Sequence, residues 1–278
     1  MHVGNSLRDI FGISKPIIGA VHFAPLLGYK DSPGIESILE NAEKDLRALE
    51  EGGVDGVIFE NNYDLPHKIN VGPETVVSMS YLCAELGKDL SIPFGISVLW
   101  NDYKAALAIA KVVGGKFVRV PVFVDSVETD FGVINADPVE VIKYRSNIEA
   151  EGVSLFTDIQ VKHATMLKER PIAESAIEAE KQGADVLIVT GRWTGNAPDI
   201  SKLREAKESS KLEIIVGSGL DASNVERIFQ YADGAIVSTS LKEGRAIASE
   251  RNVKPMSARI NTQKVFELMR IVKKIREY

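Results

Sequence analysis

Several short apolar segments of the chain end in ionisable or amide side chains. His22 ends the first of them, Glu60 and Asn61 end the second, Arg119 ends a later one and Asp158 another. Burying a carboxylate, an imidazole or a guanidinium is costly unless the group pairs or binds a ligand. We therefore predict one site, in which Glu60 or Asp158 is a base and Lys162, Arg119 or His22 stabilises an oxyanion.

Lys162 and His163 closely follow Asp158. A lysine beside other cations in a half-buried cleft can lose its proton and act as a base or a Schiff-base nucleophile. A solvated loop lysine followed by a histidine at a helix start is the alternative interpretation. We include Lys162 among the catalytic candidates and His163 among the substrate-binding ones. Substituting Glu60, Asp158 or Lys162 is then expected to reduce turnover more than stability.

A glycine-rich turn, GSGL at 217–220, gives the strongest local signal. Glycines let the backbone approach an anion, and N–H groups and a following helix start favour phosphate. The next apolar segment ends in serine and threonine, which add hydroxyl and N–H groups. The alternative to a phosphate site is that the glycines only permit a tight turn. The predicted phosphate site consists of Gly217, Ser218, Gly219, Ser238 and Thr239. Gly219→Asp is expected to weaken it, because a carboxylate would crowd and repel the anion.

Further amide and hydroxyl groups at segment ends complete the predicted binding set, namely Asn61, Asn101, Thr190 and Thr194. The loop TGRWTG at 190–195 suits closure over a ligand, although an ordinary glycine-rich turn fits it equally well. His67 has no such place at a segment end.

Cofactor motifs are weak in this chain. His22, Glu60 and Asp158 could together hold a divalent metal, but no compact ligand motif such as H-E-x-x-H occurs, so we assign no metal ligands. The turn at 217–222 also matches the dinucleotide pattern GxGxxA. The next segment ends without an acid to hold a ribose, so no nucleotide cofactor is predicted.

Eight apolar segments alternate with segments of helical period. Most are continuous runs of Val, Ile and Phe, which is typical of parallel strands covered on both faces. We expect strands at 17–22, 56–61, 93–98, 117–120, 154–159, 186–190, 214–217 and 235–238. We expect helices at about 35–51, 74–89, 102–112, 138–150, 172–182, 199–209, 222–230 and 259–276.

A βα unit that recurs eight times in 278 residues favours an α/β fold, a single (β/α)₈ TIM barrel. Reactive groups of this fold lie at the C-terminal ends of the strands, and phosphate often binds after strands seven and eight. No linker-like stretch divides the chain, so we predict one domain over 1–278. A long loop, 121–138, follows strand four and is expected to be a functional lid or a mobile segment.

Composition restricts the partners. A net charge of −6 and a pI near 5.4 argue against nucleic acid and anionic membranes. No apolar stretch reaches the ~20 residues of a membrane span, and the first residues lack the features of a signal peptide. The single cysteine, Cys83, cannot form an intrachain disulfide. We expect a cytoplasmic protein and leave a homo-oligomer open.

Four segments carry a family resemblance: PIIGAVH at 16–22, GVIFEN at 56–61, DIQVKHA at 158–164 and the loop at 190–195. Together they resemble the BtpA/SgcQ family over nearly the whole chain. The resemblance implies a barrel of the ribulose-phosphate-binding type. The first-named cyanobacterial member is linked to photosystem I biogenesis, and other members accompany genes for sugar uptake and metabolism. The family offers no settled reaction, so no catalytic residue is carried over.

Two functions remain open from the sequence. One is an isomerase, epimerase or lyase that acts on a small phosphorylated sugar or nucleoside-like metabolite. The other is a non-catalytic assembly or stabilising factor that uses the outer surface of the barrel. An assembly factor does not require ionisable groups at so many strand ends, so we favour the enzyme.

Overall fold

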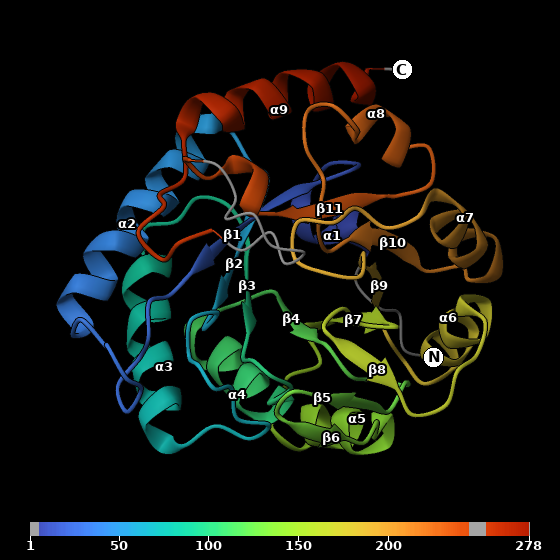
Figure 1. The fold of residues 1–278 in the computed structure, drawn as a ribbon, viewed down its shortest axis with the longest axis horizontal. Helices are drawn as coiled ribbons and strands as arrows, with labels where there is room; N and C mark the ends of the chain where they lie inside the picture. The colour runs from blue at the N-terminus through green and yellow to red at the C-terminus, as the bar shows by residue number, and fades with distance from the viewer. Residues whose placement is uncertain (1–5, 245–253, 278) are drawn as a thin grey trace.

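Eight parallel strands close into a barrel with helices around it, as the computed structural model shows for residues 6–244 and 254–277 (Figure 1). The barrel order is β1-β11-β10-β9-β7-β4-β3-β2. The strands are β1 (Ile17–His22), β2 (Gly56–Glu60), β3 (Phe94–Ser97), β4 (Phe117–Val120), β7 (Ser154–Ile159), β9 (Val186–Val189), β10 (Glu213–Val216) and β11 (Gly234–Val237). The predicted TIM-barrel fold is confirmed.

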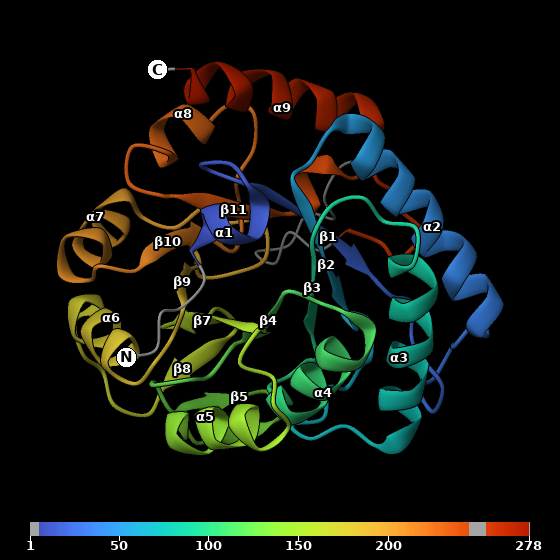
Figure 2. The same ribbon diagram turned by 180° about the vertical axis from the view of Figure 1, so that it is seen from behind.

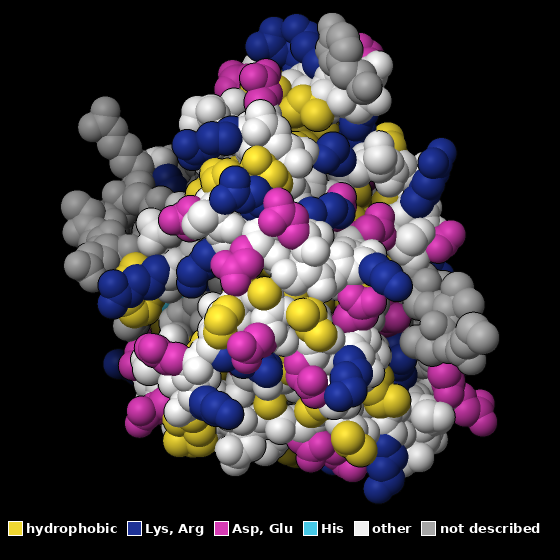
Figure 3. Space-filling model, turned by 90° about the vertical axis from the view of Figure 1, so that its right-hand side faces the viewer, with side chains coloured by type: hydrophobic (Ala, Val, Ile, Leu, Met, Phe, Trp, Pro, Cys, Tyr) yellow, Lys and Arg dark blue, Asp and Glu magenta, His cyan; other side chains and the backbone are white. Residues whose placement is uncertain are grey.

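The outer ring consists of helices that follow the strands in turn. They are α2 (Ile35–Gly52), α3 (Pro73–Gly87), α4 (Tyr103–Val113), α5 (Pro138–Asn147), α6 (Ile172–Lys181), α7 (Ile200–Ser209), α8 (Val225–Ile228) and α9 (Thr262–Arg276). The helix expected over 222–230 is reduced to one short turn, α8. On the side of the molecule that carries α6 and α7, basic and acidic side chains are interspersed (Figure 3).

The barrel interior is an apolar core distinct from the layer between strands and helices. Phe117 and Phe156 stack at its centre with ring centroids 4.4 Å apart. A short helix that the sequence did not predict, α1 (Leu7–Phe11), covers the N-terminal end of the barrel (Figure 2). Leu7 is buried there, and the Phe11 ring lies 5.8 Å from Phe117. The apolar interior is therefore sealed at one end, and ligands must enter at the other.

Aspartates at the N-terminal rim fix the starts of neighbouring strands. Gly53 ends α2 with a left-handed φ of 84°, and Asp55 then accepts the N–H of Ile17 at 2.7 Å. Asp185 repeats this role by accepting the N–H of Leu155 at 2.7 Å. The repeated Gly-x-Asp pattern of the sequence is thus a device for joining a helix end to a strand.

The long segment after β4 contains regular structure. Its strands β5 (Val127–Thr129) and β6 (Gly132–Ile134) form a hairpin, and β8 (Ala164–Met166) pairs with β5 to make a three-stranded antiparallel sheet. This sheet has an apolar core of its own, which includes Trp100 and Val161. We call it the hairpin sheet.

Among the described helices, none combines the length and the apolar character that crossing a bilayer requires.

Candidate functional site

The polar side chains at the strand ends form a layer directly above the apolar interior. Side chains alternate along a strand, so each residue two positions beyond an interior residue also points inward. Phe117 is therefore followed by Arg119, and Phe156 by Asp158. The same relation places His22, Glu60, Ser97, Thr190, Gly217 and Ser238 in this layer.

Arg119 is held between two carboxylates. Its Nε and Nη2 atoms donate to the two oxygens of Asp158 at 2.8 and 2.9 Å, and its Nη1 atom lies 3.4 Å from Glu60. The side chain of Arg119 is 6% exposed and that of Asp158 is fully buried. Asp158 does not line the cavity, so its geometry suits orienting Arg119 better than acting as a base.

Glu60 also contacts His22, whose Nε2 atom lies 3.3 Å from Glu60 Oε2. Burial alone would raise the pKa of Glu60, but the hydrogen bond with His22 and the charge of Arg119 lower it to about 2. Burial and the nearby Lys242 lower the pKa of His22 to about 4. At neutral pH Glu60 is therefore ionised and His22 is a neutral imidazole that donates through Nε2.

Lys162 lies in a turn with an unusual backbone. Gln160 and His163, on either side of it, have left-handed φ values of 53° and 61°, which are uncommon for residues other than glycine. Side-chain contacts hold both: Gln160 Nε2 donates to the carbonyl of Arg170 at 2.9 Å, and His163 Nε2 lies 2.8 Å from Thr194 Oγ1. Such maintained strain is typical of functional sites.

This turn directs Lys162 into the cavity. Its Nζ atom lies 3.5 Å from the carbonyl oxygen of Gly217. Burial, together with the positive charge of Arg119, lowers the pKa of Lys162 to about 8. A lysine with such a pKa exchanges protons readily near neutral pH, which makes Lys162 the best-suited acid or base of the site.

The predicted phosphate loops border the same cavity. The N–H groups of Gly219, Thr239 and Ser240 have no acceptor among residues 6–244 and 254–277. Ser238 lines the cavity, and its buried Oγ atom also lacks a partner within these ranges. Ser218 is already engaged, because its hydroxyl donates to the carbonyl of Asn196 at 2.9 Å. The predicted helix start makes no contribution, since α8 begins only at residue 225 and has four residues.

Gly219 has a packing role that the sequence did not reveal. Its φ is +73°, and a Cβ atom there would lie 2.0 Å from the amide nitrogen of Ala197. The loop after β9 rests directly on this glycine. Gly219→Asp would therefore displace the backbone at 197 in addition to crowding and repelling an anion, and an effect of this variant could not be assigned to the anion alone.

The cavity has a volume of about 420 Å³, within the usual range for small-molecule sites. Of the residues predicted from the sequence, those in its wall are His22, Glu60, Arg119, Lys162, His163, Thr194, Gly217, Ser218, Gly219, Ser238 and Thr239.

Asp158, Asn61, Asn101 and Thr190 lie outside the cavity wall. Asn61 accepts the N–H of Leu99 at 2.6 Å, and Asn101 accepts that of Val122 at 2.8 Å, so both hold neighbouring turns in place. Thr190 accepts the N–H of Lys162 at 3.1 Å. Asn61, Asn101 and Thr190, which were predicted to bind substrate, therefore hold the backbone of the cavity wall in place.

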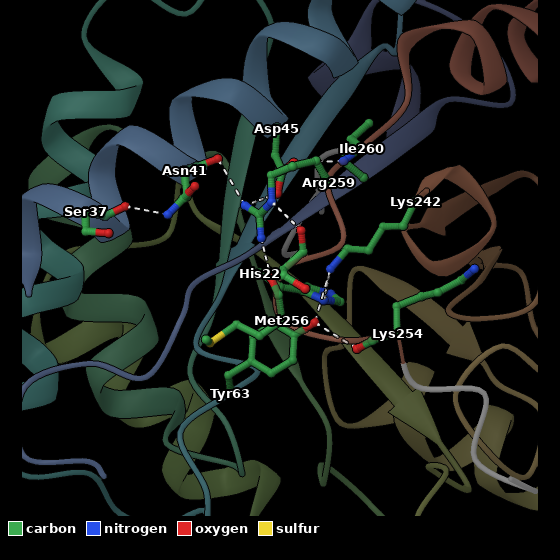
Figure 4. Close-up of polar contacts among 11 residues, drawn as sticks. His22, Ser37, Asn41, Asp45, Tyr63, Lys242, Lys254, Met256, Arg259 and Ile260 are labelled. Atoms are coloured by element: carbon green, nitrogen blue, oxygen red, sulfur yellow. Dashed lines mark hydrogen bonds and ion pairs between the residues drawn. The ribbon is translucent and has the colours of Figure 1, made fainter. Parts of the chain in front are cut away.

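Lys242 and Tyr63 are components that the sequence reasoning missed. Lys242 Nζ lies 3.4 Å from His22 Nδ1 and 3.3 Å from the Tyr63 hydroxyl, which in turn donates to the carbonyl of Lys254 at 3.3 Å (Figure 4). Burial lowers the pKa of Lys242 to about 8. The sequence could have indicated Lys242, because it lies two residues after Ser240 in the loop that follows the last strand.

The segment that carries Lys254 is anchored to α2. Arg259 Nη1 lies 3.0 Å from Asp45 Oδ2, and the N–H of Ile260 donates to Asp45 Oδ1 at 2.8 Å (Figure 4). Asp45 is buried, so this contact fixes the chain beside His22 and Tyr63. His67, Trp100 and Phe131 are further wall residues that the predicted site lacked.

The acidic and imidazole groups do not form a metal site. Within the described ranges, no three or more His, Cys, Asp or Glu side chains are arranged to hold a metal ion. Arg119 lies between Glu60 and Asp158, where a cation would have to bind.

We compared the sequence and the barrel with those of known proteins. The model of the BtpA family matches residues 13–272. The chain belongs to the BtpA family. It is 36% identical to the photosystem I biogenesis protein BtpA of Synechocystis, covering 85% of this chain and 83% of that one. It is 32% identical to the putative sgc region protein SgcQ of Escherichia coli, covering 87% and 92%.

A solved structure shares the fold of this BtpA-family protein. Thiamine phosphate pyrophosphorylase from Pyrococcus furiosus superposes with a TM-score of 0.56 over 97% of this chain and 99% of that chain. The sequence identity is 17%, so the likeness extends to the fold alone.

Proposed function

We propose that this BtpA-family protein is an enzyme that moves a proton on a small phosphorylated metabolite, as an isomerase, an epimerase or a lyase does. One observation carries the proposal: a lysine with a pKa lowered to about 8 and unpaired anion-binding groups border one cavity. Lys162 is the lysine, and Ser238 and the N–H groups of Gly219, Thr239 and Ser240 are the anion-binding groups.

The chemistry assigns different tasks to the charged residues. Neutral Lys162 accepts a proton from a carbon beside a carbonyl group, and the charge of Arg119 stabilises the developing oxyanion. His22 keeps its Nε2–H on Glu60 and positions that carboxylate. In an isomerase or epimerase, protonated Lys162 then returns the proton to a carbon or oxygen of the enolate. In a lyase, the enolate expels a leaving group from the adjacent carbon and Lys162 gives its proton to that group. Glu60 is too weak a base for this step at a pKa of about 2, so it balances the positive charges instead.

Binding and fold support the phosphate part of the proposal. The loops after strands seven and eight of a TIM barrel commonly bind phosphate, and these are the loops at 217–219 and 238–240. The fold neighbour from Pyrococcus furiosus is named after thiamine phosphate, which is a phosphorylated compound.

Deuterium exchange tests the proposal without knowledge of the complete reaction. Phosphorylated aldoses and ketoses are incubated with the protein in D₂O, and loss of the C–H signal beside the carbonyl is followed by ¹H NMR. We expect exchange on at least one compound and a loss of about 10²–10⁴-fold in Lys162→Met. Lys44→Met, on the exposed face of α2, is the control and should exchange normally. Absence of exchange over the panel, with and without divalent metal, would overturn the proposal.

A second candidate function rests on the name of one relative. The Synechocystis protein is a photosystem I biogenesis protein, which favours an assembly factor that acts through its outer surface. Under that function, Lys162→Met and Ser238→Ala would leave complex assembly unchanged, and substitutions on the outer helices would impair it.

A further inference from the structure

The cavity has two chemically different ends on opposite sides of the barrel. The anion-binding loops follow β10 and β11. In the closed order β1-β11-β10-β9-β7-β4-β3-β2, the strands across from β10 and β11 are β3 and β4. The turns after β3 and β4 thus face the phosphate loops across the mouth. Lys162, in the turn after β7, and His22, at the end of β1, lie between them.

The end beside β3 and β4 is mainly apolar and aromatic, although Asp130, next to Phe131, also lines the cavity. Trp100 and Leu99 line it from the turn after β3, and Phe131 lines it from the tip of the hairpin sheet. The Phe131 ring stands edge-on to the ring of His67, with centroids 5.2 Å apart. Leu65 adds an aliphatic side chain that is 56% exposed. These apolar and aromatic side chains do not hydrogen-bond to the hydroxyl groups of a small sugar phosphate, whereas a flat ring packs against them.

This aromatic end is held rigidly. Trp100 is buried in the core of the hairpin sheet, and its backbone N–H donates to the carbonyl of Lys68 at 3.0 Å. Asn61 fixes the backbone of Leu99 through both of its side-chain atoms, at 2.6 and 3.2 Å. A wall built in advance of ligand binding loses little entropy when a flat group docks against it.

His67 adds one polar feature to the aromatic end. Its Nδ1 atom is buried and has no hydrogen-bond partner among residues 6–244 and 254–277. Burial lowers the pKa of His67 to about 4, so the ring is neutral at physiological pH and offers either a donor or an acceptor. A buried polar atom without a hydrogen-bond partner destabilises the folded protein. A polar atom of a ligand ring would supply the missing hydrogen bond.

We infer that the substrate is an organic phosphate whose other end is a flat aromatic or heteroaromatic ring, bound between Trp100, Phe131 and His67. The inference rests on the proposed function and narrows its substrate class. The phosphate occupies the loops at 217–219 and 238–240, the ring lies at the hairpin sheet, and the carbon skeleton between them passes Lys162. This arrangement uses both ends of one cavity with a single ligand.

Tryptophan fluorescence tests the inference, because the chain has only two tryptophans, Trp100 and Trp193. In a Trp193→Phe variant, Trp100 reports on the aromatic end alone. The probes are adenosine 5′-monophosphate, uridine 5′-monophosphate and ribose 5-phosphate, which share the phosphorylated ribose and differ in the ring. Adenosine is the control ligand that has the ring and lacks the phosphate. Equilibrium dialysis measures each affinity without fluorescence, both in the variant and in the unmodified protein.

We expect at least one nucleotide to bind about tenfold or more tightly than ribose 5-phosphate and to quench Trp100. Phe131→Ala should remove most of this difference and leave the affinity for ribose 5-phosphate unchanged. Phe266→Ala, on the exposed face of α9, is the matched control and should change neither affinity.

Equal affinity of ribose 5-phosphate and both nucleotides, unaffected by Phe131→Ala, would overturn the inference and leave the proposed function intact. Adenosine that binds as tightly as its monophosphate would overturn the single-ligand arrangement. If no phosphorylated compound binds to the unmodified protein, both the inference and the proposed function fail.

Discussion

Arg119 donates two hydrogen bonds, of 2.8 and 2.9 Å, to the carboxylate of Asp158. This ion pair lies at the boundary between the apolar interior and the cavity. Both residues are buried, so neither charge can be compensated by water. The remaining nitrogen of Arg119 points to Glu60, which links the pair to His22. The charged layer therefore depends on Asp158, although Asp158 does not face the ligand space.

This relationship reverses the sequence-based expectation for Asp158→Asn, which was a loss of turnover with normal stability. Breaking a buried ion pair by removing one partner costs about 3–5 kcal/mol. We expect Asp158→Asn to lower the free energy of unfolding by that order in urea denaturation. The control is Glu43→Gln, which breaks the exposed pair with Arg47 on α2 and should leave stability nearly unchanged. An unchanged midpoint for Asp158→Asn would show that the pair is not structural.

Lys162→Met should behave in the opposite way and stabilise the protein. The pKa of Lys162 is about 8 in the folded protein, below its ordinary value of 10.5, so the folded state disfavours the charged form. Stability is therefore lost as the pH falls from about 10.5 to 8, and the loss persists at pH 7. We expect Lys162→Met to be more stable than the unmodified protein by about 1–3 kcal/mol at pH 7 and equally stable near pH 11.

Thermal unfolding over this pH range measures the effect. Lys44→Met, which alters an exposed lysine, should show no comparable pH-dependent gain. A variant that is less stable than the unmodified protein at pH 7 would mean that charged Lys162 is well compensated in the folded state.

Lys242→Met should change the titration of His22. After burial, the charge of Lys242 is the main reason why the pKa of His22 is only about 4, and Glu60 acts in the opposite direction. Removing Lys242 should therefore raise the pKa of His22. Histidine ring signals followed by NMR between pH 3 and 8, with His22→Gln for assignment, measure it. An unchanged His22 titration would exclude the contact between Lys242 and His22.

Ser238→Ala tests the anion-binding loops without disturbing the fold. The hydroxyl has no partner among the described residues, so its loss should cost little stability. A hydrogen bond to a charged group contributes about 1.5–3 kcal/mol, so the affinity for phosphate esters should fall roughly ten- to a hundredfold. Ser154→Ala removes another buried, unpartnered hydroxyl, at the opposite end of the barrel, and should leave the affinity unchanged in calorimetric titrations.

The fold was predictable because long-range geometry follows from local patterns. Each of the eight barrel strands coincides with an apolar run, to within two residues at either end, and the Gly-x-Asp pattern marks where helices give way to strands. Helix α1 escaped prediction because it has only five residues and no helical period. Strands β5, β6 and β8 escaped for the same reason, since three residues cannot display an alternation.

The site was predictable where residues end barrel strands and unpredictable where they follow long loops. His22, Glu60 and Arg119 share the mouth because parallel strands end at one rim. Burial was invisible in the sequence, so Asp158 and Asn61 were assigned to the ligand although they hold other protein groups. Phe131 and the other aromatic wall residues gave no positional signal.

A crystal of the protein grown with ribose 5-phosphate would locate the phosphate of the bound sugar. We expect the phosphate group within hydrogen-bonding distance of Ser238 Oγ and of the N–H groups of Gly219 and Thr239. We also expect the sugar to extend toward Lys162. A phosphate bound only on the outer surface, with the cavity holding solvent at saturating ligand, would overturn the proposed phosphate site.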